Sequence, residues 1–319
     1  MANTFNDVVN LYNIIGTTFS GNVIQPNRPL YVFDALCKSR EWNLATTPNK
    51  GDAVTFPVLG AWSSNTGALS PTTTVFNTGE TLSYTRKSIT LSLYGDYTVM
   101  DVMQARVETF ADEVSDAAFN LSDMGMNSIN KIARTVMDKN KFSNGVSGTL
   151  SSTYHYYASN GTITTMGALK ARDVREIVAD LKTDNVRPFS DGFYYAVVHP
   201  IQKTQLRSDS DNASWTESTK YTGDAGAGML KIQGDIGVFE GVRFIESPEC
   251  PKLTNTITAY FMGNDAVGKA IGFDLTIKTN PVLAGPFGNL LTLNWSALLG
   301  YGILRREALR VVYTKSDKR

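Results

Sequence analysis

The longest pattern of apolar positions in the chain runs from Tyr97 to Asp138 and predicts a single long helix. Apolar residues recur there mainly at steps of three and four, with no proline between them: Val99, Met103, Val107, Phe110, Val114, Ala117, Leu121, Met124, Ile132 and Val136. Thr98 followed by Asp101 is typical of an N-terminal capping box. Such a helix is about 55–60 Å long, whereas a compact globule of this chain length is about 50 Å across. The pattern therefore predicts an elongated, plate-like subunit that assembles with others.

A long β-hairpin is predicted directly before this helix. Apolar residues alternate on one face of each strand: Val54, Phe56 and Val58 on the first strand, and Ile89, Leu91 and Leu93 on the return strand. Pro57 confines the first strand to a sheet edge or a strand end. The connection from Gly60 to Thr81 is much longer than an ordinary turn. It is either a surface loop or an arm that lies across a neighbouring copy, with Trp62 and Phe76 as anchors.

The remainder of the chain mixes helices and strands without an internal repeat, which favours an α+β fold. Helices are predicted over 165–183, with Thr165 as the cap, and from Pro200 onward. Strands are predicted in five places: 154–157, 192–198, 236–246 around a tight turn at Glu240-Gly241, 256–262 and 290–313. Within the last of these, Gly300 and Gly302 indicate a bend or the close approach of another backbone. Residues 1 to about 48 show no sustained period, which is typical of an arm.

Composition narrows the classes of function. Thirty basic and thirty acidic residues give a net charge of zero, so the chain lacks the basic excess that proteins use to neutralise phosphates. Direct sequence-specific binding of nucleic acid is therefore not expected. Cys37 and Cys250 are too few for a disulfide framework and favour folding in a reducing cytoplasm. No apolar stretch approaches the roughly 20 residues of a membrane span, and the first residues lack the pattern of a signal peptide.

Candidate catalytic and metal-binding residues are few. His199 would need a nucleophile and an orienting carboxylate to act as the base of a hydrolase, and no Gly-x-Ser-x-Gly elbow accompanies it. A structural role at a strand end is favoured for it, and a stacking role among tyrosines for His155. Asp209, Asp211 and Asp224 lack the glycine and the glutamate of a calcium loop. The sequence predicts no enzyme, no cofactor and no metal site.

Five short segments in a fixed order carry a resemblance to a known family: Lys50-Gly-Asp-Ala-Val-Thr-Phe, Tyr94-Gly-Asp-Tyr, Tyr195-Ala-Val-Val-His-Pro-Ile-Gln, Leu206-Arg-Ser-Asp and Gly234-Asp-Ile-Gly-Val-Phe-Glu-Gly-Val-Arg-Phe-Ile-Glu-Ser. Together with the order of predicted elements, they resemble the major capsid proteins of tailed bacteriophages, whose fold is named after phage Hong Kong 97. More narrowly, the chain resembles a podovirus-type capsid family. The resemblance covers most of residues 30–313.

The resemblance implies a division of the chain into an N-terminal arm, an extended loop, a peripheral domain with a spine helix, and an axial domain. The expected boundaries are, in that order, 1–48, 49–95, 96–165 with 280–319, and 166–279. Copies would form hexamers and pentamers that close an icosahedral shell around double-stranded DNA. By the same resemblance the shell is assembled in the host bacterial cytoplasm, expands as DNA is packaged, and becomes part of the virion.

The same resemblance implies partners. The start of the chain carries no long charged segment, which favours a separate scaffolding protein over a fused one, and a portal and a decoration protein complete the expected set. We expect Trp62, Phe76, Arg86 and Lys87 at the interface between subunits. Two alternatives stay open. The first is an encapsulin-like bacterial protein cage of the same fold that encloses cargo enzymes, and the second is a hydrolase that uses His199.

Overall fold

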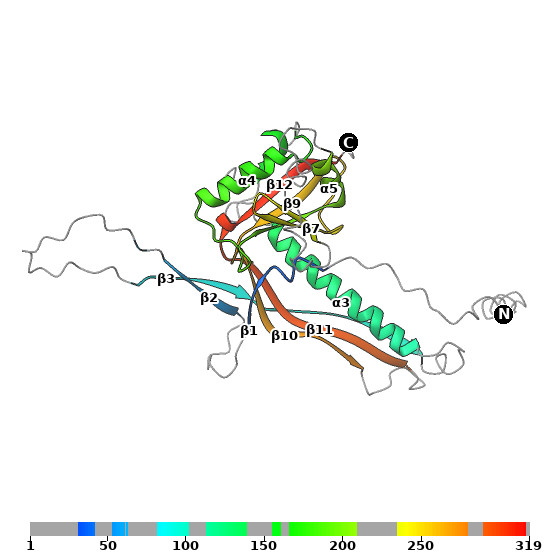
Figure 1. The fold of residues 1–319 in the computed structure, drawn as a ribbon. Helices are drawn as coiled ribbons and strands as arrows, with labels where there is room; N and C mark the ends of the chain where they lie inside the picture. Colours follow the sequence, from blue (N-terminus) through cyan, green and yellow to red (C-terminus); the bar gives the residue numbers. More distant parts are fainter. Residues whose placement is uncertain are drawn as a thin grey trace, which may run out of the picture.

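A computed structural model of the chain describes two bodies joined by one helix (Figure 1). The described residues are 31–41, 53–60, 62, 82–101, 113–138, 155–160, 166–208, 235–279 and 290–316. We call the body with the six-stranded sheet the head and the body with the four-stranded sheet the shaft. A two-stranded hairpin projects from the side of the shaft, away from the head (Figure 1).

The head is a mixed six-stranded sheet with helices packed against it. Its strands follow the spatial order β5 (His155–Tyr157), β12 (Leu309–Lys315), β9 (Thr256–Met262), β6 (Tyr194–Val198), β8 (Val242–Glu246) and β7 (Asp235–Phe239). The helices are α4 (Ala171–Thr183) and α5 (Pro200–Arg207), with short turns η2 (Ala158–Asn160) and η3 (Arg306–Ala308). Phe244, Tyr260 and Phe261 are fully buried at its centre. Glu240 and Gly241 both have positive φ angles, as the predicted tight turn between β7 and β8 requires.

The shaft is a four-stranded sheet covered on one face by a long helix. Its strands follow the order β1 (Lys38–Glu41), β10 (Val267–Thr279), β11 (Leu290–Ile303) and β4 (Ser92–Asp101), and the helix is α3 (Glu113–Asp138). Leu121 and Ile129 of the helix pack against Trp295 of the sheet. Gly125 lies where the two come closest, because a Cβ on it would be 2.7 Å from Leu275 and 3.2 Å from Trp295. This glycine therefore lets the helix lie close to the sheet.

Helix α3 belongs to both hydrophobic cores. Its last turns place Ala133 and Met137 in the core of the head, where both are fully buried. Phe33 packs edge-on against Tyr260 in the same core with ring centroids 5.5 Å apart, and its backbone N–H donates to Asn130 Oδ1 at 2.9 Å. The first half of the helix packs on the shaft. The helix therefore packs in both bodies and connects them.

The prediction of one helix from Tyr97 to Asp138 is wrong at its start. Residues Tyr97–Asp101 lie in β4, so Thr98 is not a helix cap, while residues 102–112, which include Phe110, lie outside the described residues. Apolar residues at every second position of 92–101 also fit a strand, and pairing with β11 over the whole of β4 decides between the two. The described helix has 26 residues, or about 39 Å. Elongation comes instead from β11, whose 14 residues extend about 47 Å, and from the hairpin.

The other predicted elements agree with the structure in most places. The strands over 192–198, 236–246, 256–262 and 290–313 and the helix from Pro200 are confirmed. The helix expected over 165–183 begins only at Ala171, because Asp173 accepts a hydrogen bond from the Lys170 N–H at 2.9 Å and so starts the helix there. Thr165 lies outside the described residues. The strands β1 and β10 were not predicted.

Candidate assembly surfaces

The projecting hairpin consists of β2 (Ala53–Leu59) and β3 (Tyr84–Thr90), paired antiparallel over seven residues. Only its base is buried: Val54, Phe56 and Ile89 form a small cluster with Ala270 and Leu304 of the shaft. The prediction that Ile89, Leu91 and Leu93 share one face is wrong for Leu93, which is 68% exposed in the next strand. Among the described residues, the buried contacts between the hairpin and its own subunit therefore lie in this cluster.

Apolar side chains are exposed at the other end of the described hairpin. Leu59 and Tyr84 form a cross-strand pair, and the Gly60 N–H continues the ladder to the Ser83 carbonyl at 2.9 Å. More than half of the surface of each of these apolar side chains is exposed: Leu59, Trp62, Leu82 and Tyr84. Apolar groups on an arm that projects from the body are typical of a contact with another molecule.

The structure describes three of the four residues that we expected at a subunit interface. Trp62 is 57% exposed, as an anchor for a neighbouring copy requires. Arg86 pairs with Pro57 and Lys87 with Phe56, so these two basic side chains point to opposite faces of the hairpin. Both are exposed, and they do not form one patch. Phe76 lies outside the described residues.

A second candidate surface is the face of the shaft sheet that points away from α3, which we call the open sheet face. In β4, residues at odd positions lie on this face, because their neighbours Tyr94 and Met100 pack with the core beneath α3. The exposed apolar residues of the face are Leu93 at 68%, Tyr97 at 66%, Val99 at 48% and Phe273 at 39%. Among the described residues, only the base of the hairpin packs over this side of the sheet.

A hollow of about 890 Å³ lies on the open sheet face. Small or polar residues, including Gly95 and Ser296, line this hollow together with Leu93, Tyr97 and Lys278. A Cβ on Gly95 would be 2.7 Å from the carbonyl oxygen of Trp295, so no larger residue fits there. A hollow floored by small residues and bordered by apolar side chains can receive a protruding segment of another molecule. Sequence reasoning did not identify this surface.

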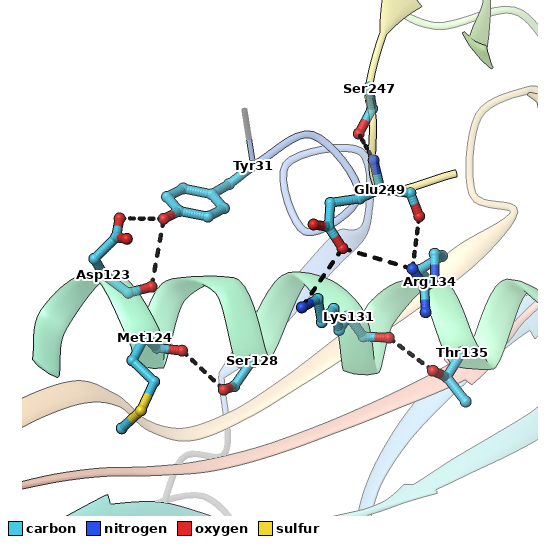
Figure 2. Close-up of polar contacts among 9 residues, drawn as sticks. All are labelled: Tyr31, Asp123, Met124, Ser128, Lys131, Arg134, Thr135, Ser247 and Glu249. Atoms are coloured by element: carbon cyan, nitrogen blue, oxygen red, sulfur yellow. Dashed lines mark hydrogen bonds and ion pairs between the residues drawn. The ribbon is translucent and has the colours of Figure 1, made fainter. Parts of the chain in front are cut away.

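Polar contacts hold α3 rigidly between the head and the segment that precedes β1 (Figure 2). The carboxylate oxygen Oε2 of Glu249, in the head, lies 3.8 Å from Lys131 Nζ and 3.6 Å from Arg134 Nη1. The backbone carbonyl oxygen of Glu249 accepts a hydrogen bond from Arg134 Nη1 at 2.6 Å. Nearer the start of the helix, the hydroxyl of Tyr31 contacts Asp123. The basic residues that the sequence places near the end of this helix therefore fasten it to the head.

A buried ionic group fastens the same segment to the shaft sheet. Asp34 accepts hydrogen bonds from Lys269 Nζ at 2.8 Å and from the Tyr301 hydroxyl at 2.5 Å. Burial, and then the charge of Asp34, raises the pKa of Tyr301. Burial, followed by the same carboxylate, raises the pKa of Cys37, so this thiol stays protonated and is a poor nucleophile. The group serves to hold the chain together.

His199 caps helix α5, which is the structural role at a strand end that we expected. Its Nδ1 accepts a hydrogen bond from the Ile201 N–H at 3.2 Å, and its own backbone N–H donates to Gln202 Oε1 at 2.9 Å. Nδ1 can accept only when the imidazole is neutral at that nitrogen. Burial, and then the charge of Lys252, lowers the pKa of His199, while Glu246 opposes this. Because Nδ1 accepts, the neutral ring carries its proton on Nε2, the nitrogen that takes the proton in a catalytic triad.

We expect this cap to make stability depend on pH. Because the fold lowers the pKa of His199, the unfolded chain binds the proton more readily, and stability is full above the unfolded value of about 6.5 and falls below it. His199→Ala should cost about 1 kcal/mol at pH 7.5 and flatten this dependence, and His199→Asn should cost less because it keeps an acceptor. Urea unfolding at pH 5 to 8 measures both. An unchanged pH slope in His199→Ala would contradict the assignment.

The described residues contain neither a candidate metal site nor a candidate membrane span. They contain no cluster of three or more His, Cys, Asp or Glu residues that could hold a metal ion, and none of their helices is long and apolar enough to cross a membrane. Asp209, Asp211 and Asp224 lie outside them. What the described structure presents is a projecting arm and an uncovered sheet face.

Comparison with solved structures finds the same fold in phage capsids. The chain is similar to a capsid protein of cyanophage P-SCSP1u, with a TM-score of 0.65 and 16% identity over 93% of this chain and 92% of that one. It is similar to the capsid of Ralstonia phage GP4, with a TM-score of 0.66 and 13% identity over 94% and 95%. It is also similar to the capsid of Helicobacter pylori bacteriophage KHP30, with a TM-score of 0.65 and 12% identity over 99% and 100%. No protein-family model and no curated protein matches the chain.

Proposed function

We propose that the chain is the major capsid protein of a tailed bacteriophage, a structural protein with the Hong Kong 97-type fold. The observation that carries the proposal is the likeness in fold to phage capsid subunits over at least 93% of this chain in each of the three comparisons. The projecting hairpin and the open sheet face support it independently, because both expose apolar surface that the described part of the subunit leaves uncovered.

In this proposal the subunits tile through their hairpins. The hairpin of one copy reaches over the shaft of the next, and its apolar end, with Trp62, packs against that neighbour. Phe76, Arg86 and Lys87 belong to the same interface as expectations from the sequence. The domain boundaries also stay as proposed: an arm over 1–48, an extended loop over 49–95, a peripheral domain over 96–165 with 280–319, and an axial domain over 166–279.

The assembled shell would consist of hexamers and pentamers and enclose double-stranded DNA within the virion. A net charge of zero supports a wall that surrounds DNA without gripping it, because counterion release would contribute little. A separate scaffolding protein would guide assembly in the host cytoplasm, a portal would admit the DNA, and a decoration protein would bind outside. The shell would expand from a precursor during packaging.

The content of particles isolated from infected cells tests this function. We expect nuclease-treated particles to release double-stranded DNA of uniform length and to contain a portal. Particles that instead hold a folded enzyme and no DNA would identify a bacterial protein cage of the same fold. Particles that hold neither, together with loss of an enzymatic activity in His199→Ala, would favour the hydrolase alternative.

A further inference from the structure

The hairpin meets the shaft at a patch of the smallest residues in the sheet. In the β10–β11 ladder Gly268 lies opposite Gly302, and Ala270 lies opposite Gly300. Residues two apart in a strand share a face, so all four lie together on one side of the sheet. We call this patch the glycine seat. Glycine within a strand is unfavourable by roughly 0.5–1 kcal/mol, so three of them in one place need a physical reason.

Ile89 of the hairpin fills the glycine seat. Its side chain is 5% exposed. A Cβ on Gly302 would lie 2.9 Å from Ile89 Cγ1, and a Cβ on Gly268 would lie 3.0 Å from Ile89 Cδ1. A Cβ on Gly300 would run into the carbonyl oxygen of Thr90, which is backbone and cannot turn away. The three glycines are therefore required because hairpin atoms occupy the space where side chains would stand.

Among the described residues, the hairpin is buried against the rest of the subunit in the cluster around the seat, and β3 continues through Leu91 into β4. The cluster around it contains Val54, Phe56 and Leu304 and is separate from the cores of the head and the shaft. A strand of seven residues is about 23 Å long, so a tilt of about 10° at the seat moves the far end by about 4 Å. A small change in the position of Ile89 in the seat therefore produces a larger displacement at the apolar end of the hairpin.

We propose that Ile89, through its fit in the glycine seat, is the positioning residue that fixes the direction in which the hairpin leaves the subunit. The inference rests on the proposed function, because this direction decides which surface of a neighbouring copy the hairpin reaches. A two-stranded hairpin is marginally stable by itself, so the seat also keeps β2 and β3 paired.

Hydrogen exchange of the unassembled, full-length subunit tests the seat directly. In Ile89→Ala we expect the amides of β2 and β3 to exchange at least tenfold faster, while those of β6 and β9 in the head keep their protection. Ile89→Val is the matched control, because it keeps both carbons attached to Cβ, and should exchange as the natural protein does. If Ile89→Ala also loses protection in the head, the comparison is made with Gly302→Ala, which leaves the hairpin sequence intact.

A double-mutant cycle separates the seat from general weakening of the sheet. Gly302→Ala alone should accelerate exchange in the hairpin, because the new methyl displaces Ile89. In the Ile89→Ala background the nearest remaining atom is the Cβ of residue 89, at 3.8 Å, which is an ordinary contact. In this background Gly302→Ala should cause no further increase in the exchange rate of the hairpin amides. Independent, additive effects would overturn the inference, since residues in contact are expected to couple.

Assembly provides the second readout. Under assembly conditions we expect Ile89→Ala and Gly302→Ala to give no shells or irregular ones by electron microscopy, and Ile89→Val to give normal shells. Hairpin exchange in Ile89→Ala equal to that of the natural protein, or normal shells from it, would overturn the proposal. If the natural protein itself does not assemble, the proposed function fails while the exchange experiment still decides whether Ile89 orders the hairpin.

Discussion

Replacing Gly60 to Thr81 by an Asn-Gly turn is expected to leave a folded subunit that no longer assembles. The described residues that form the hydrophobic clusters of the head and the shaft all come from other parts of the chain, and Asn-Gly closes short hairpins well. The midpoint of thermal unfolding should therefore stay within a few degrees. Assembly should be lost because the subunit can no longer reach its neighbour. Circular dichroism and electron microscopy measure the two effects.

A second variant keeps the length of the segment and removes only apolar contacts. Trp62→Ser with Leu82→Ser exchanges two side chains that are more than half exposed, so it should fold normally and also assemble poorly. Normal shells from the shortened hairpin would show that the arm is a dispensable surface loop, the alternative that its sequence left open. Unfolding of the shortened protein would show that the segment belongs to a core.

Tyr97→Glu is expected to abolish assembly through the open sheet face. Tyr97 is 66% exposed in the subunit, so an exposed carboxylate there should change the free energy of unfolding by less than about 1 kcal/mol. In an assembled shell the same carboxylate would be buried in a contact between copies, without a partner, at a cost of several kcal/mol per subunit. Sedimentation velocity should show folded subunits and no particles.

The control places a carboxylate on the head instead. Lys182→Glu lies at an exposed position of α4 and should neither unfold the subunit nor prevent shells, unless the head also contacts a neighbour at that point. Normal shells from Tyr97→Glu would show that the open sheet face stays exposed to solvent in the assembly. The hairpin would then have to dock elsewhere.

Local periodicity was sufficient to predict most of the head and the hairpin. The strand at Tyr194–Val198 is fully buried, so its continuous apolar run could only be a strand or a short buried helix, and the following Pro200 fixed its end. Gly300 and Gly302 indicated a bend or the close approach of another backbone, and the structure places the Thr90 backbone against Gly300 and the Ile89 side chain against Gly302. Features that depend on residues close together in the chain could thus be predicted from the sequence.

Features that depend on residues far apart in the chain could not be predicted from the sequence. The second half of β4 fits a helical and an alternating pattern equally well, and only its partner β11, about 190 residues later, selects the strand. The strand β10 was missed because Gly268, Lys269 and Asp274 interrupt its apolar pattern. Lys269 is buried there only because Asp34 comes from the far end of the chain. No local rule predicts such a partner.

The candidate surfaces also divide into features that the local sequence predicts and features that require the fold. Trp62 was identified from its place in a polar segment, whereas the open sheet face required knowing which side of β4 lies beneath α3. Leu93 and Tyr97 look like core residues in the sequence, and their exposure emerges only when the sheet is built. Arg86 and Lys87 are neighbours in the sequence, and the pleat of β3 sends them to opposite faces.

Electron microscopy of the purified natural protein, alone and co-expressed with the proposed scaffolding protein, tests the central claim most directly. Tiling of this subunit with its own kind predicts capsomer rings or closed icosahedral shells of megadalton mass. A folded monomer in every condition, at concentrations up to the millimolar range, would contradict it.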